Sequence, residues 1–189
     1  VRVGLERGAA VAGATFVLHV PAAPTPLPPP LMLLPAPPLA PPPRDCPAPP
    51  TLSTVDVPFF GRAIGRAPLY IVGVRGQPLT VHLGGPDGMA YTQYGWVAQI
   101  EWALMPEYAG RVTVSADYLV DGSRALMTES QWQAPSTSVV LDPLPANGVP
   151  MAPHWNEWIG TLFLPGAGCA TLHAQWFGGA WTIPFAAGR

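Results

Sequence analysis

Apolar and polar residues alternate with a period of two along much of the chain after residue 50. Even-numbered positions carry the larger apolar residues at 96–102, 112–118 and 170–176, and odd-numbered positions carry them at 79–83 and 181–185. Successive side chains of a strand point to opposite sides of a sheet. Each of these segments therefore predicts a strand with one buried side and one side facing solvent.

Glycine, proline and aspartate separate the alternating segments. Residues 84–88 are a Gly-, Pro- and Asp-rich cluster, and Asp121 followed by Gly122 is typical of a hairpin turn. Residues 144–153 predict a long turn-rich loop. Because no segment has a sustained helical period, the short strands favour an all-β, two-sheet immunoglobulin-like sandwich over residues 51–189.

Residues 1–23 have the order of a secretory signal peptide. Arg2 and Arg7 precede an apolar run at 8–20, and small residues follow it. A wrongly assigned start of the chain would produce the same stretch, so both interpretations stay open. The run is shorter than the roughly 20 residues that a membrane-spanning helix needs, so we expect no transmembrane span.

Residues 24–50 predict a disordered, proline-rich linker. Half of the residues at 21–50 are proline, and very few are charged. Proline lacks an amide hydrogen and fixes φ, which disfavours helix and sheet and favours an extended polyproline conformation. Such a segment serves as a semi-rigid spacer. The alternative is a ligand for the aromatic grooves that bind proline-rich peptides.

Charge excludes two classes of partner. Charged residues make up only 11% of the chain, and the net charge is −2. All nine basic residues are arginines, and they are scattered along the sequence. There is no basic stripe of the kind that neutralises nucleic-acid phosphates and no polybasic cluster for an anionic membrane surface. We expect no nucleic-acid partner.

The residue types that catalysis requires do not converge. The sequence has no Gly-x-Ser-x-Gly elbow and no Gly-rich phosphate loop, and Cys169 lacks the local signature of cysteine proteases. His154 and Glu157 are three residues apart, but the neighbouring prolines predict a loop there. His82 and His173 lie opposite the apolar positions of their strands. The sequence therefore predicts no enzyme, no metal site and no cofactor.

Aromatic residues near predicted loops are the candidate ligand surface: Tyr91, Tyr94, Trp155 and Trp158. Exposed rings stack on sugars or anchor protein partners. The alternative is that these rings close the ends of the sandwich. Strand alternation assigns the remaining strand tryptophans to the core: Trp96, Trp102, Trp176 and Trp181.

Three stretches resemble uncharacterised secreted or lipid-anchored bacterial immunoglobulin-like domains. They are residues 94–114, the hairpin at 118–122, and residues 164–169 leading into a final hairpin. The resemblance covers residues 46–188 and implies the same fold. It also implies a disulfide between Cys46, which precedes a proline, and Cys169.

Two departures from these relatives matter. The aromatic residue that follows the cysteine in such domains is Ala170 here. Arg44 and Asp45 precede Cys46 and do not form a lipobox, so lipid attachment is not supported.

Only two cysteines are present, and an export signal would place them in an oxidising compartment where disulfides persist. Two unrelated thiols remain the alternative to a bond. The sequence predicts a non-catalytic interaction or structural module, extracytoplasmic or secreted, in the bacterial cell envelope, with a protein or polysaccharide partner. The alternatives are a carbohydrate-binding module that uses the loop aromatics and, disfavoured, a hydrolase.

Overall fold

The computed structural model describes residues 2–7, 10–15, 29–58, 60–72, 74, 76, 79–84, 91–129, 134–143 and 155–189. This part of the chain consists of strands, turns and extended segments, and it contains no helix able to span a membrane. β1 (Arg2–Arg7) and β2 (Ala10–Thr15) pair with each other in a sheet of their own. The remainder of the signal-peptide prediction, at residues 1, 8–9 and 16–23, lies outside the described residues.

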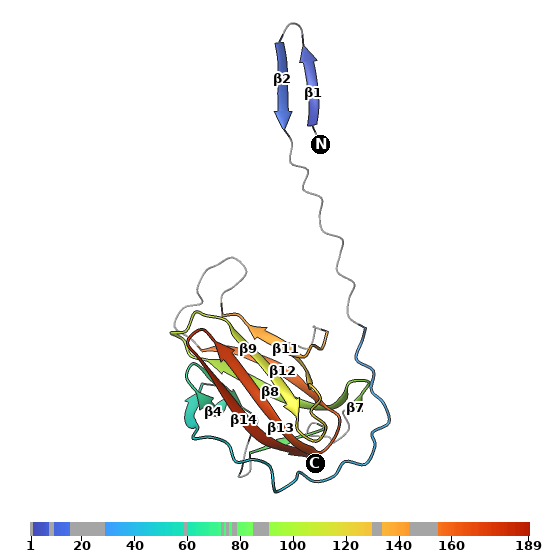
Figure 1. Ribbon diagram of the computed structural model, residues 1–189, viewed down its shortest axis with the longest axis vertical. Coiled ribbons are helices and arrows are strands. Elements are labelled where there is room, and N and C mark those ends of the chain that lie inside the picture. The colour runs from blue at the N-terminus through green and yellow to red at the C-terminus, as the bar shows by residue number, and fades with distance from the viewer. Residues whose placement is uncertain are drawn as a thin grey trace.

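Two sheets form the main domain (Figure 1). The first, here the β8 sheet, has the order β10-β12-β8-β5-β4-β3, with β7 also beside β8. Its strands are β3 (Ser53–Val57), β4 (Gly61–Arg66), β5 (Leu69–Val72), β7 (Tyr91–Thr92), β8 (Gly95–Leu104), β10 (Leu126–Thr128) and β12 (Asn156–Leu164). The second, here the β13 sheet, has the order β11-β9-β13-β14-β6. Its strands are β6 (Thr80–His82), β9 (Val112–Tyr118), β11 (Ser138–Leu141), β13 (Gly168–Trp176) and β14 (Gly179–Gly188).

The strand order confirms the predicted all-β, two-sheet sandwich. In an immunoglobulin domain the sheets are A-B-E-D and C-F-G, and variable domains add C′ beside C. Here β5-β8-β12-β10 occupies the first set of places, and β11-β9-β13-β14 occupies the second. Among the described strands, every pair is antiparallel except β6 with β14, which are parallel. In the chain, β10 precedes β11, so the chain visits the D place before the C′ place.

The core lies between the two sheets. The even-numbered residues of β8 are buried as the alternation predicts, with Trp96 3% and Trp102 2% exposed. The indole nitrogen of Trp181 on β14 donates a hydrogen bond of 3.1 Å to the carbonyl of Leu69 on β5 and joins the sheets. Trp176 is only half-buried, which differs from the core position predicted for it. It is the last residue of β13, where the sandwich opens to solvent.

A second apolar cluster lies on the outer side of the β8 sheet. Tyr70, Val72 and Ala103 are buried there together with residues of β3 and β4. Trp155 packs edge-on against Tyr70, with ring centroids 5.8 Å apart. Every residue of β5 is therefore buried, because apolar groups cover both sides of this strand.

Residues 29–50, here called the strap, follow the surface of the sandwich (Figure 1). The amide of Leu34 donates to the carbonyl of Tyr91 at 2.8 Å, and the amide of Met32 donates to the side-chain oxygen of Gln93 at 2.8 Å. Further along, the amide of Arg189 donates to the carbonyl of Ala40 at 3.2 Å. These contacts are not those of a free-standing spacer. Proline content predicts the extended conformation but carries no information about what the extended chain lies against.

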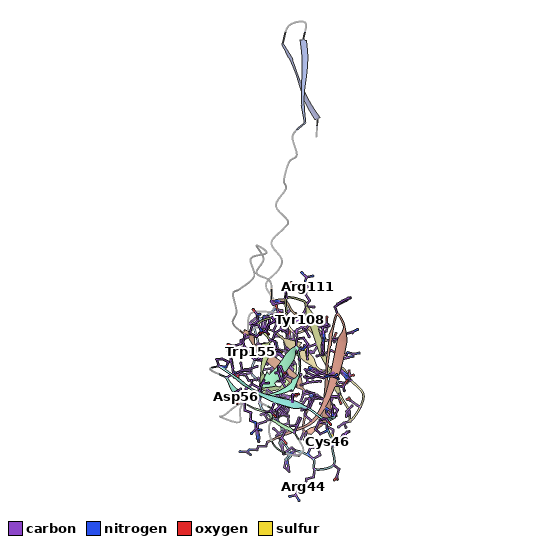
Figure 2. The ribbon with its side chains drawn as sticks, turned by 90° about the vertical axis from the view of Figure 1, so that its left-hand side faces the viewer. Arg44, Cys46, Asp56, Tyr108, Arg111 and Trp155 are labelled. Carbon is purple, nitrogen blue, oxygen red and sulfur yellow. A yellow bond between two sulfur atoms is a disulfide. The ribbon has the colours of Figure 1, made fainter. Side chains whose placement is uncertain are left out.

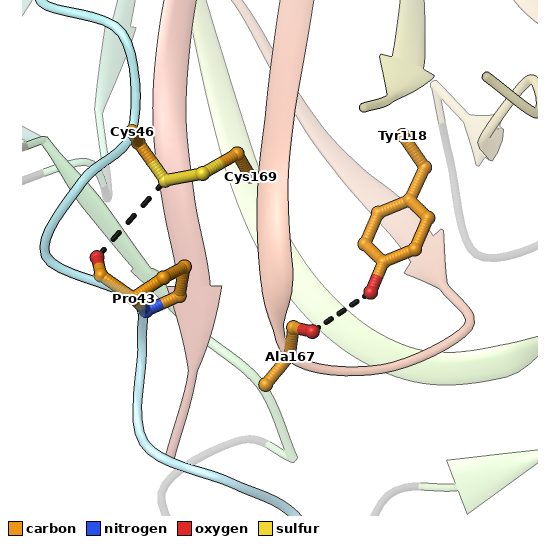
Figure 3. Close-up of a disulfide and its surroundings, with 5 residues drawn as sticks. All are labelled: Pro43, Cys46, Tyr118, Ala167 and Cys169. Atoms are coloured by element: carbon orange, nitrogen blue, oxygen red, sulfur yellow. Dashed lines mark hydrogen bonds between the residues drawn. A yellow bond between two sulfur atoms is a disulfide. The ribbon is translucent and has the colours of Figure 1, made fainter. Parts of the chain in front are cut away.

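The predicted disulfide between Cys46 and Cys169 is present, with the two Cα atoms 5.4 Å apart (Figure 3). Cys169 is half-buried on the side of β13 opposite the core, together with His173. The bond therefore fastens the strap to the outer side of the β13 sheet. Nearby, the hydroxyl of Tyr118 donates to the carbonyl of Ala167 at 2.7 Å and fixes the turn before β13.

Candidate functional site

The four aromatic residues nominated from the sequence do not form one surface. Tyr91 and Tyr94 lie beside the start of β8, where Tyr91 pairs with Trp96. Trp155 and Trp158 lie beside the end of β8, because Asn156 pairs with Leu104. The length of that strand separates the two pairs of rings.

Each of the four rings is half-buried and packs against other apolar side chains. Tyr91 lies 5.3 Å from Trp96 and Tyr94 lies 5.7 Å from Phe163, measured between ring centroids. Trp158 pairs with Trp102 across two strands and packs against the main core. The predicted loop at residues 154–157 is wrong at its end, because β12 begins at Asn156. The rings thus contribute to packing at both ends of the sandwich.

Several chain segments meet at the end of the sandwich that carries Trp155. Trp176 pairs with Val112 across β13 and β9, and Leu141 pairs with Val112 from the other side. Residues 105–111, 142–143 and 176–179 are therefore neighbours, and we call them, with Trp155, the loop end. In an antibody variable domain, the B–C and F–G loops at this end carry the binding site.

Phe177 is the most exposed large apolar residue of the described chain, at 98%. It sits at the tip of the β13–β14 hairpin, followed by Gly178 with φ of +93°. The Trp176 ring packs so closely on Gly179 that an added Cβ would lie 2.9 Å from it. The hairpin therefore presents the Phe177 ring on a closely packed base. Exposure at a hairpin tip leaves no periodic signal in the sequence, so strand alternation does not point to this ring.

Arg111 supplies charge at the same end. Its guanidinium Nε donates to the carboxylate of Asp142 at 2.6 Å, and its side chain remains 74% exposed. Figure 2 shows Arg111, Tyr108 and Trp155 towards one end of the domain and Cys46 and Arg44 at the other. The loop end is therefore remote from the disulfide.

A polar network lies on the outer side of the β13 sheet. The Asp117 carboxylate forms an ion pair with Arg124, whose Nε lies 3.0 Å from it, and lies 3.0 Å from His173 Nε2. His173 Nδ1 lies 3.3 Å from the Thr182 hydroxyl. Carboxylate, imidazole and hydroxyl follow one another as in a hydrolytic triad. All three stand on paired strands of the β13 sheet.

Of the other histidines, His82 is exposed on β6, and His19 and His154 lie outside the described residues. Among the described residues, no three His, Cys, Asp or Glu side chains come together as a metal-binding group. The polar network therefore cross-links β9, β13 and β14 and stabilises the outer side of the sheet.

Two carboxylates face the same outer side of the β8 sheet. Glu157 pairs with Ala103 and Glu101 pairs with Ile159, so the two glutamates are diagonal neighbours. Burial raises the pKa of Glu157, and the charge of Glu101 raises it further. This pair holds like charge close together, which opposes folding at neutral pH.

No protein-family model, curated protein or solved structure matches this chain. Function must therefore be argued from the residues themselves. Three features distinguish the surface: the exposed tip ring at the loop end, the polar network of the β13 sheet, and the strap with its disulfide. Of these, only the loop end exposes a large apolar ring beside a charged side chain on closely spaced loops.

Proposed function

We propose that this chain is a non-catalytic interaction module that works outside the cytoplasm and binds a protein partner with its loop end. The observation that carries the proposal is Phe177, whose ring is 98% exposed at the tip of a short hairpin. Leaving such a ring in water forgoes the free energy of burying it, on the order of 1.5–3 kcal/mol. A partner that covers the ring recovers this free energy.

The neighbours of Phe177 suit a protein interface. Aromatic residues and arginine are enriched where binding free energy concentrates, and charged residues surround an apolar centre. Phe177 would be the apolar centre, and Arg111 would lie at the rim. Because Arg111 already pairs with Asp142, the rim carries both signs of charge. This supports a partner surface that is apolar at its centre and mixed in charge around it.

Location outside the cytoplasm rests on the disulfide between Cys46 and Cys169. Disulfides persist in oxidising compartments and are rare in reducing ones. The resemblance to secreted bacterial domains supports the cell envelope as that location. The signal-peptide order of residues 1–23 points in the same direction.

Site-specific photo-crosslinking in the exporting host tests the proposal. A photoreactive phenylalanine analogue replaces Phe177 in one variant and Val120 in another. Val120 is a matched control, because it is 67% exposed in a turn beside the disulfide, away from the loop end. We expect a discrete protein adduct at position 177 and none at 120.

Phe177→Ser should abolish co-purification of the partner identified by that adduct. Equal adducts at both positions, or none at 177, would contradict the proposal. Attachment of polysaccharide instead of protein at position 177 would replace it with the carbohydrate-binding alternative.

A further inference from the structure

The strap forms one wall of an apolar cleft of about 600 Å³ on the side of the sandwich. The strap contributes Cys46, Ala48, Pro49 and Pro50. Leu52, Ile64 and Leu79 form the opposite wall, and all three pack against the main core. Cavities of roughly 300–1,000 Å³ with mostly apolar walls are the usual size and character of small-molecule sites.

Arg44 brings a positive charge to this cleft. Arg44 is the sole ionisable group among its described lining residues. The Arg44 side chain is exposed, and among the described residues no ion pair involves it. Figure 2 shows Arg44 at the outer limit of the domain, beyond Cys46. Among the described residues, the cleft thus combines apolar walls with one positive charge at its rim.

We propose that this cleft binds a single-chain fatty carboxylate, with the alkyl chain between the strap and the core and the carboxylate at Arg44. An alkyl chain matches walls of proline, alanine, leucine and isoleucine, since its burial is favourable in proportion to area. One guanidinium matches one carboxylate in charge and in its two-donor geometry. A phosphate monoester would bring a second negative charge that no described lining residue offsets. The site is separate from the loop end and does not depend on the proposed function.

The strap makes the site conditional on the disulfide. Cys46 lines the cleft and is bonded to Cys169 on β13, so the bond holds the outer wall in place. Loss of the bond should let the wall move away and weaken binding. The ligand and the disulfide would then stabilise the same arrangement of the strap.

Fluorescence titration of the full chain with cis-parinaric acid tests the proposal, with its methyl ester as an uncharged ligand of the same shape. We expect saturable binding of the acid and weaker binding of the ester. Arg44→Ala should weaken binding of the acid by about threefold to fivefold, which is the contribution of an exposed ion pair. It should leave the affinity for the ester unchanged. Arg66→Ala is the matched control, because Arg66 is exposed on neighbouring β4 and does not line the cleft.

Ala48→Trp locates the site independently of charge. Ala48 is exposed on the strap and lines the cleft, so a large ring there fills the cleft from the strap side and replaces no core side chain. This variant should lose binding of both acid and ester while keeping the wild-type far-UV spectrum. Absence of binding, equal affinity for acid and ester, or full binding by Ala48→Trp would each overturn the proposal.

Discussion

The strap and the sandwich are each stabilised by a different kind of interaction. The sandwich buries large side chains from two sheets in one continuous core. The strap buries little: Leu31, Met32 and Leu33 are 48%, 56% and 73% exposed, although all three are large and apolar. It is attached at a few points by hydrogen bonds, by one covalent bond and by the packing of Leu39 against the main core.

This difference explains how a proline-rich chain can adopt a defined path without a core of its own. A sandwich distributes its stability over many contacts, so losing one large contact weakens the whole structure cooperatively. A strap concentrates its stability in separate attachments. Losing one attachment should release the nearby segment and leave the rest of the molecule intact.

The largest expected effect is in the sandwich. Trp102→Ala removes a ring that is 2% exposed, and the cavity it leaves should lower the free energy of unfolding by about 3–5 kcal/mol. Urea denaturation measures the loss. Trp176→Ala is the control, because it removes the same type of side chain from a half-buried position. It should lower the free energy of unfolding clearly less. Equal losses for the two variants would show that burial does not determine stability in this sandwich.

The covalent attachment of the strap comes next. Cys46→Ser, which removes the bond to Cys169, should lower the free energy of unfolding by about 2–4 kcal/mol. The far-UV spectrum should remain that of a β protein, because the main core keeps both sheets. Reduced wild-type protein should match the variant. Collapse of the β spectrum would contradict the distinction between strap and sandwich, and a loss below about 0.5 kcal/mol would contradict the expected contribution of the bond.

A weaker attachment lies at the start of the strap. The side chain of Gln93 accepts from the Met32 amide at 2.8 Å and donates to the Pro30 carbonyl at 3.3 Å. Gln93→Ala should cost about 0.5–1.5 kcal/mol locally. Hydrogen exchange should accelerate at the Met32 amide, while global unfolding shifts by no more than about 0.5 kcal/mol.

Gln99→Ala is the matched control. Gln99 is exposed on β8, and among the described residues its side chain hydrogen-bonds only with Glu101. It should leave the rate of hydrogen exchange at the Met32 amide unchanged. If Gln93→Ala lowers global stability as much as the loss of a core side chain, the strap belongs to the cooperative unit.

The smallest effect concerns charge on the outer side of the β8 sheet. The pKa of Glu157 is raised above its ordinary value of 4.5, so the folded state holds the proton more tightly than the unfolded state. Stability is therefore lost as pH rises from about that value through the folded pKa. Glu157→Gln should raise stability at neutral pH by a few tenths of a kcal/mol, since solvent screens the exposed pair.

The advantage of Glu157→Gln should vanish in acid, where the wild-type carboxyl is also neutral. Thermal unfolding across this pH range measures the difference. Glu107→Gln, at an exposed turn residue, is the control variant measured alongside it. A Glu157→Gln variant that is less stable than wild type at neutral pH would reverse the assigned sign.

Much of the sandwich could be predicted because strand alternation is a local property. The apolar residues that alternate within 96–102 and 112–118 predict which side of each strand faces the core, and those residues are buried. The turn at Asp121 and Gly122 is equally local: the Asp121 carboxylate accepts from the Ser123 amide, and Gly122 has φ of +73°. Two cysteines allow one intramolecular pairing, but the sequence left open whether they form a disulfide or remain two unrelated thiols.

Non-local facts were decided only by the tertiary structure. The sequence could not show that Trp155 and Tyr91 lie at opposite ends of β8, because that depends on strand register. It could not place Phe177 beside Arg111, since their proximity follows from the pairing of β13 with β9. The path of the strap is the clearest case. Its prolines determine an extended chain, but its partners lie far along the sequence, and only folding brings them within reach of hydrogen bonds and a disulfide.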